Sequence, residues 1–254
     1  MPETAHNLAV FIDLENVVIG ARDAGFKSFD IGLVLRRIVE KGNIVVKRAY
    51  ADWSRFDREK RQHHEASVDL IDMSGSKLTG KNSADIKMVV DAIEMAFTKP
   101  HIDTFALVSG DSDFSPLVTK LRENNKRIIG VGVKSSTSPL LIDNCDEFLL
   151  YDDLAKIPER RQRKRREGSG QTTKEQQEAF DLLMEAIEAL QREDKDVMQA
   201  SLVKDTIRRK QPQFNEGYHG YKSFTALLLD AQKRKLITLA KDPRSGTYLV
   251  SEAE

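Results

Sequence analysis

The sequence predicts an α/β protein, with a doubly wound parallel sheet followed by a smaller winged-helix domain. Over the first 150 residues, short apolar runs alternate with amphipathic helix patterns. This alternation is typical of a parallel sheet with helices on both faces. After residue 173 the pattern changes to three amphipathic helices and a strand–turn–strand segment. A basic segment without core-forming residues separates the two parts, so we expect two domains.

The strands of the first domain are short apolar runs. The first covers residues 8–12 and is followed directly by Asp13, a pattern typical of a strand buried on both faces. We expect the others at residues 44–50, 68–73, 104–108, 128–133 and 148–150.

Helix signals lie between these strands. Asp30 is expected to cap a helix over residues 31–39, and residues 55–65 form a polar, helical stretch. Pro116 suits the first turn of a helix that runs through Leu121. Ser83 is expected to cap a helix whose apolar residues are Ile86, Val89, Val90, Ile93 and Phe97.

The C-terminal part is expected to fold separately. Helices are predicted over residues 176–190, over a segment through 202–207 that Pro212 stops, and from Ser223 onward. Residues 236–239 and 247–250 flank a turn-forming segment and are predicted to pair as strands. We therefore place a first domain at residues 1–157, a basic linker at 158–173 and a winged helix at 174–254.

Charge and cysteine content limit the function classes. Forty Lys and Arg residues balance forty Asp and Glu residues, so only local patches could attract nucleic acid. The single cysteine, Cys145, excludes an intrachain disulfide and a cysteine-based zinc site. No apolar run approaches the roughly 18 residues of a membrane span. The N-terminus lacks the basic region of a secretory signal, so we expect a cytoplasmic protein without a membrane partner.

Four aspartates follow strands or begin a helix in the first domain. Asp13 ends the first strand, Asp111 and Asp113 follow the fourth, and Asp85 lies in the first turn of the helix after Ser83. If the first and fourth strands are neighbours, these carboxylates meet in one crevice at the carboxyl ends of the strands. Four Asp residues without His or Cys form a hard-oxygen site suited to Mg²⁺ or Mn²⁺. Such ions can polarise a scissile phosphate and activate water.

Each residue also has a simpler interpretation. Asp113 could be a turn former without a role in metal binding. Asp85 could likewise serve only to stabilise the helix, by interacting with the positive end of the helix dipole. Asn16 and Ser109 could orient the carboxylates or serve as caps. Asp91 lies six residues after Asp85, about 240° around the helix, so its spacing favours a salt bridge or a supporting role.

The motifs containing these residues resemble the NYN domain, the LabA-like branch of the PIN-like nuclease superfamily. The resemblance covers roughly residues 7–152 and rests on three segments, Phe11–Asn16, Lys81–Asp85 with Asp91, and Ser109–Phe114. It implies a Mg²⁺- or Mn²⁺-dependent ribonuclease, although some members only bind RNA. The metal-binding acids of the family would map to Asp13, Asp85, Asp111 and Asp113, and its conserved Asn to Asn16.

Residues 175–252 are similar to the OST-HTH, or LOTUS, domain. This likeness rests on Gly217-Tyr218, on Tyr221–Phe224 and on the Leu227-Leu228 helix with its closing strands. It implies a module that recruits RNA or a protein partner.

Two other functions remain as alternatives. In one, both domains are a non-catalytic RNA-binding scaffold and the acids are structural. In the other, the chain is a phosphatase of the haloacid dehalogenase type, which also has an Asp after its first strand. Such phosphatases need a second Asp two residues further on, and this chain has Glu15 there.

Basic residues outside the acidic cluster could contact RNA phosphates. Lys77 and Lys81 lie in a Gly-containing loop before Asp85, and six of the seven residues from 160 to 166 are basic. A solvated loop and linker explain both patterns equally well. We expect RNA as the partner, with a protein partner and a homodimer as further options; the RNA contacts predicted are Lys77, Lys81, Arg163, Lys164, Arg165 and Arg166.

Overall fold

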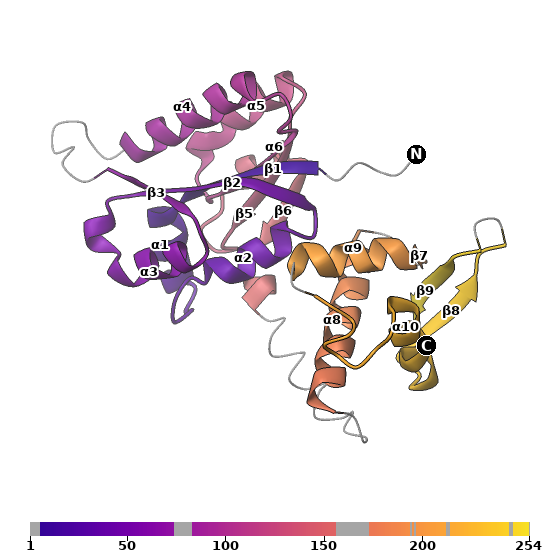
Figure 1. Cartoon of the computed structure of the whole chain (residues 1–254). Coiled ribbons are helices and arrows are strands. Elements are labelled where there is room, and N and C mark those ends of the chain that lie inside the picture. The colour runs from indigo at the N-terminus through magenta and orange to yellow at the C-terminus, as the bar shows by residue number, and fades with distance from the viewer. Residues whose placement is uncertain are drawn as a thin grey trace. The chain divides into compact units, whose positions relative to one another are not determined.

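The computed structural model describes residues 6–73, 83–155, 173–193, 195, 197–211, 214–243 and 246–253. The chain divides into two compact units, one within residues 1–161 and the other within residues 162–254 (Figure 1). Each unit has its own hydrophobic core.

A six-stranded sheet forms the centre of the N-terminal unit. Every neighbouring pair of its strands is parallel, as the alternation of strand and helix signals predicted. The strand order is β3-β2-β1-β4-β5-β6, so the order reverses between β1 and β4. The strands are β1 (His6–Asp13), β2 (Gly42–Ala51), β3 (Asp69–Asp72), β4 (Thr104–Val108), β5 (Arg127–Gly132) and β6 (Glu147–Leu150).

Helices cover both faces of this sheet, as Figure 1 shows. On one face, α1 (Leu14–Asp23) and α2 (Ile31–Ile38) pack against Leu8, Val10 and Ile12 of β1. On the other, α4 (Ser83–Thr98), α5 (Ser115–Glu123) and α6 (Pro139–Asn144) pack around Ala9 and Phe11. The alternation of β1 side chains between two cores is the reason why its whole apolar run is buried.

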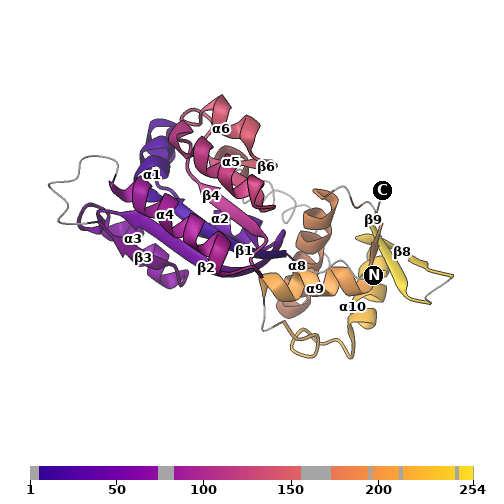
Figure 2. The same cartoon turned by 90° about the horizontal axis from the view of Figure 1, so that it is seen from above.

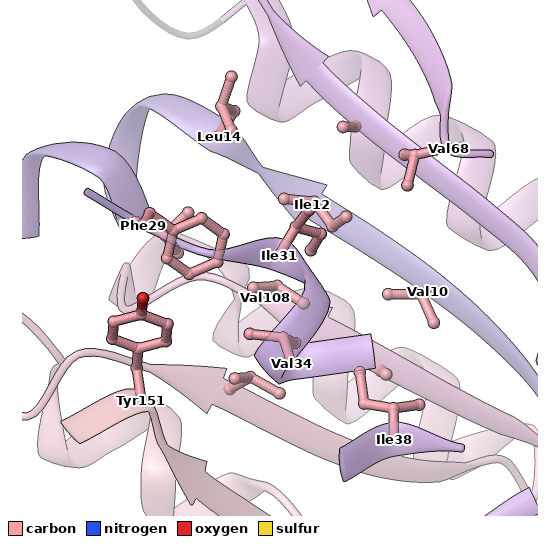
Figure 3. Close-up of a cluster of buried hydrophobic side chains, with 14 of the residues drawn as sticks. Val10, Ile12, Leu14, Phe29, Ile31, Val34, Ile38, Val68, Val108 and Tyr151 are labelled. Carbon is pink, nitrogen blue, oxygen red and sulfur yellow. The ribbon is translucent and has the colours of Figure 1, made fainter. Parts of the chain in front are cut away.

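The α2 side of the sheet shows how local signals and packing agree. Asp30 caps α2 by accepting a hydrogen bond from the Gly32 amide at 2.8 Å, as predicted. Figure 3 shows Ile31, Val34 and Ile38 of α2 facing the strands, with the Tyr151 ring beside Phe29. The Tyr151 hydroxyl accepts from the Asp30 amide at 2.8 Å, so the end of the sheet also holds the start of α2.

Several elements were not predicted. Asp13 caps α1, which begins immediately after β1 and lay outside the predicted elements. The one-turn 3-10 helices η1 (Trp53–Arg55) and η2 (Ser112–Phe114), and α6, were also absent from the prediction. The polar helix predicted over residues 55–65 is α3 (Asp57–Glu65).

The apolar residues named for α4 divide between two sides of the helix, because Val89 and Ile93 pack against the core and the other three are exposed. The exposed fractions of Ile86, Val90 and Phe97 are 61%, 53% and 62%, whereas Met88 and Met95 point into the core. α4 is apolar on both sides, so periodicity alone does not decide its rotation. The inward face is the one that carries Ala92, Ala96 and Asp91.

The C-terminal unit has the element order and strand pairing of a winged helix. Helices α8 (Lys174–Gln191), α9 (Ala200–Lys210) and α10 (Phe224–Lys233) pack around one core. An antiparallel sheet follows the order β7-β9-β8, from strands β7 (Met198–Gln199), β8 (Ile237–Lys241) and β9 (Tyr248–Glu252). The short strand β7 was not predicted.

None of the helices in the described part of the chain has the length and apolar character needed to cross a bilayer.

Candidate metal-binding site at the switch point of the sheet

The point where the strand order reverses brings two of the predicted motifs together. β1 and β4 are hydrogen-bonded neighbours, with Ile12 opposite Val108 in the register. The residues that follow, Asp13 on β1 and Ser109 after β4, therefore emerge side by side. This adjacency was the condition on which the predicted crevice depended, and crevices of this kind are the usual ligand sites of doubly wound sheets.

Asp13 is a buried carboxylate held by two hydrogen bonds. The Ser109 hydroxyl donates to Oδ2 at 2.9 Å, and the Asn16 amide donates to Oδ1 at 3.3 Å. Its residue exposure is only 8%. Burial, followed by the nearby charges of Asp85 and Asp111, raises the pKa of Asp13 to about 7, although the two hydrogen bonds oppose the rise.

The loop after β4 is held by a hydrogen bond to α1 and by two hydrogen bonds within the loop. The side-chain oxygen of Asn16 accepts from the Gly110 amide at 2.9 Å, and the Ser109 hydroxyl accepts from the Asp111 amide at 3.2 Å. The Asp111 side chain caps η2 by accepting from the Asp113 amide at 2.9 Å. Ser109 and Asn16 therefore orient the acidic loop. From the sequence, these two residues could equally have been helix caps.

Gly110 is required by close packing. A Cβ atom at this position would lie 2.7 Å from the Ser136 carbonyl oxygen and 3.0 Å from the Thr137 Cα. The Ser138 amide also donates to the Gly110 carbonyl at 2.9 Å. The segment before α6 thus packs closely on the backbone of the acidic loop at Gly110.

Asp85 approaches the same crevice from the start of α4. Partial burial raises the pKa of Asp85, and the charges of Asp111, Asp113 and Glu15 raise it further. Glu15 was not predicted as part of this site; it pairs with Arg55 at 3.1 Å and adds to the negative potential. The charges of Asp85 and Asp111 therefore act on Asp13, and those of Asp111 and Asp113 act on Asp85.

The donor set fits a hard divalent cation. Among the described residues, no basic side chain forms an ion pair with Asp13, Asp85, Asp111 or Asp113. Oxygen-only donors with uncompensated negative charge suit Mg²⁺ or Mn²⁺. Within the described ranges, however, no three His, Cys, Asp or Glu side chains are gathered closely enough to enclose an ion as they stand. Binding would therefore require these side chains to move closer together.

Asp91 has a different setting from the four acids. Its carboxylate accepts from the Tyr50 hydroxyl at 2.8 Å, pairs with Lys87 and lies 3.6 Å from the Arg48 guanidinium. Its side chain is 4% exposed. The structure thus agrees with the salt bridge that the helical spacing favoured, and Asp91 anchors α4 to β2.

The predicted RNA contacts at Lys77, Lys81 and residues 163–166 lie outside the described residues. Beside Asp113, a shallow hollow of about 660 Å³ is lined by Ser112, Asp113, Ser115, Pro116, Thr119 and Leu140.

Comparison with known proteins identifies the family of the N-terminal unit. The NYN domain family matches residues 7–152, which is more than half of the chain. The chain belongs to the NYN domain family. The NYN domain is a member of the nuclease-like PIN superfamily, which agrees with the parallel sheet and the acidic switch point.

Two proteins are similar to part of this chain. A crystal structure of a protein of unknown function from Vibrio parahaemolyticus, VPA0982, matches with a TM-score of 0.52 and 30% identity, covering 61% of this chain and 98% of that one. The uncharacterized protein MJ0482 of Methanocaldococcus jannaschii is 30% identical over 143 residues, 56% of this chain and 53% of that protein. The chain thus spans about half the length of this curated relative.

Proposed function

We propose that the protein is a metal-dependent ribonuclease that hydrolyses RNA phosphodiester bonds at the switch point of its NYN domain. The observation that carries this proposal is the placement of four aspartates at one edge of the sheet, after β1, after β4 and in the first turn of α4. The pKa of Asp13 lies near 7 because burial and neighbouring carboxylates oppose its ionisation. A cation in the crevice would favour the ionised form of Asp13, and the hydrolysis of phosphate esters is one of the reactions that such metal sites support.

The residues have distinct roles in this proposal. Asp13, Asp85, Asp111 and Asp113 would hold Mg²⁺ or Mn²⁺, while Ser109 and Asn16 keep Asp13 and the acidic loop in position. When bound, such an ion supplies charge to stabilise the phosphate and lowers the pKa of a coordinated water. The hollow beside Asp113 offers room for a nucleotide next to the scissile phosphate.

RNA capture is assigned to basic residues and to the C-terminal unit. We propose that Lys77, Lys81 and the basic residues 163–166 contact backbone phosphates, which every RNA sequence offers. The winged-helix order of the C-terminal unit supports a LOTUS-type module that recruits RNA or a protein partner. Tyr218 is 72% exposed there and is available to stack on an unpaired base.

Substitution of the acids tests catalysis directly. Purified protein is incubated with single-stranded and structured RNAs, with and without Mn²⁺. Asp111→Asn preserves size but removes one negative charge, so we expect metal-dependent cleavage to be lost while the fold is retained. Asp23→Asn, at the exposed far end of α1, is the matched control and should cleave normally. Full activity in both Asp13→Asn and Asp111→Asn proteins would exclude this mechanism.

A non-catalytic RNA-binding scaffold is the second candidate, because an exposed aromatic such as Tyr218 can bind RNA without any metal. Thermal melting with increasing Mn²⁺ separates the two functions. A specific site stabilises the native state as ligand is added, so the melting temperature should rise in wild type and not in Asp111→Asn. RNA binding without metal-dependent stabilisation or cleavage would favour the scaffold.

A further inference from the structure

Helix α4 carries an apolar stripe on its outer side. The stripe consists of Ile86, Val90, Ile93 and Phe97, which are spaced by four, three and four residues and therefore follow one line along the helix. Ile86, Val90 and Phe97 are more than half exposed, whereas Ile93 is half-buried and also packs against the core beneath α4. Figure 2 looks onto α4, and no described helix or strand of the N-terminal unit covers it.

Contacts between α4 and the sheet fix the rotation of the helix that exposes this stripe. Asp91 faces the sheet, where Tyr50 and Arg48 of β2 hold its carboxylate. Ala92 and Ala96 on the same side let the helix approach the strands closely. Turning the stripe inward would move Asp91 toward solvent and break these contacts. A helix that is apolar on two opposite faces normally buries both, so the outer face is suited to a second partner.

Charges beside the stripe are complementary to those of a second copy of the same helix. Lys87 and Glu94 are seven residues apart and flank the same edge of the stripe. When two copies of α4 pack antiparallel and are centred near Asp91, Ile86 meets Phe97 and Val90 meets Ile93. Each Lys87 then approaches Glu94 of the other copy, as flanking charges do in antiparallel coiled coils.

The two groups are available for such a contact. The exposed Glu94 carboxylate forms no ion pair among the described residues. Lys87 pairs with Asp91 but is 47% exposed, and an ammonium group has three donors. A parallel arrangement is disfavoured because it would align the helix dipoles and place two Asp85 sites together.

We propose that this face of α4 is a homodimer interface in which two NYN domains pair through antiparallel α4 helices. The 16 residues of α4 span about 24 Å, so the two acidic sites would lie at opposite ends of the helix pair and outside the stripe. One helix face buries less than the roughly 800 Å² per partner of a standard interface, so the dimer should be weak and concentration-dependent.

Sedimentation equilibrium of the full chain tests this assembly from about 1 μM to about 1 mM, the range of weak association. We expect the mass to rise from 28.7 kDa toward twice that value. Val90→Glu and Phe97→Glu should each raise the dissociation constant about tenfold or more, because a charge would be buried in the interface. Val45→Glu is the matched control, since Val45 is 49% exposed on β2, and it should dimerise like wild type.

Glu94→Lys provides a variant that cannot disturb the core. It places a second ammonium group opposite Lys87 of the other copy, so it should weaken the dimer about tenfold while leaving the melting temperature unchanged. A chain that stays at 28.7 kDa over the whole range overturns the proposal. A dimer that survives Val90→Glu, Phe97→Glu and Glu94→Lys, or that Val45→Glu weakens equally, overturns it too.

Discussion

At the scale of single residues, Asp13 concentrates the electrostatic cost of the site. A carboxylate removed from water is unstable unless hydrogen bonds or a cation compensate it. Ser109 and the Asn16 amide supply two hydrogen bonds, yet the pKa of Asp13 still rises to about 7 because burial and two further carboxylates outweigh them. The ionised form of Asp13 therefore lowers the stability of the fold.

This cost predicts how stability depends on pH. The folded protein binds a proton at Asp13 more tightly than the unfolded chain does, so Asp13 should destabilise the fold as pH rises from about 4 to about 7. A pKa rise from 3.8 to about 7 corresponds to at most about 4 kcal/mol. Asp13→Asn removes this titration. In metal-free buffer, its melting temperature relative to wild type should increase between pH 4 and pH 8, and a constant difference would contradict the assigned cause.

At the scale of elements, the rotation of α4 about its own axis depends on the polar contacts of Asp91. The side of the helix that carries Ile86, Val90 and Phe97 does not face the sheet. The Asp91 carboxylate joins Lys87 on its own helix to Tyr50 and Arg48 on β2. This link fixes the rotation of α4 and, with it, the direction from which Asp85 approaches the crevice.

Removing the anchor should therefore cost stability. Asp91→Ala leaves the buried Tyr50 hydroxyl without its acceptor and Arg48 without its partner. We therefore expect the free energy of unfolding to fall by about 2 kcal/mol. This loss is smaller than for a fully buried ion pair, because Arg48 and Lys87 are partly exposed. Urea denaturation measures the loss. Asp23→Ala at the exposed end of α1 is the control, and equal stability of the two variants would refute the anchor.

At the scale of the whole molecule, the chain combines two folding units with different architectures. The parallel sheet of the N-terminal unit carries the acids, and the C-terminal unit has its own core of three helices and an antiparallel sheet. The catalysis proposed for the N-terminal unit and the RNA or protein recruitment proposed for the C-terminal unit can therefore be tested separately.

Limited proteolysis tests the predicted boundary. Trypsin should cut first between Arg160 and Arg166, because this stretch offers several basic sites and no apolar residue to bury. Two resistant fragments of roughly 160 and 85 residues are expected. First cleavage elsewhere, or a fragment that is then rapidly degraded, would argue against two independent domains.

Removing residues 159–254 tests the division of labour. If this part captures RNA electrostatically, residues 1–158 should bind RNA more weakly but cleave it at a similar rate when saturated. Each lost phosphate contact should reduce the log–log salt slope by about 0.7 for single strands. RNA affinities at several salt concentrations measure this; an unchanged affinity and slope would assign the C-terminal unit to a protein partner.

Local patterns in the sequence were enough to predict the six strands and most of the helices, and to place the four acids next to these elements. Apolar periodicity, caps such as Asp30 and a charge placed directly after a strand are local signals, and local signals persist in the fold. The packing of the folded chain set the rotation of α4. Both sides of this helix are apolar, so the side that faces the sheet depends on the contact of Asp91 with β2. The tertiary structure also decided the hydrogen bond between Asn16 and Gly110, 94 residues apart, since such a contact exists only once β1 and β4 have paired.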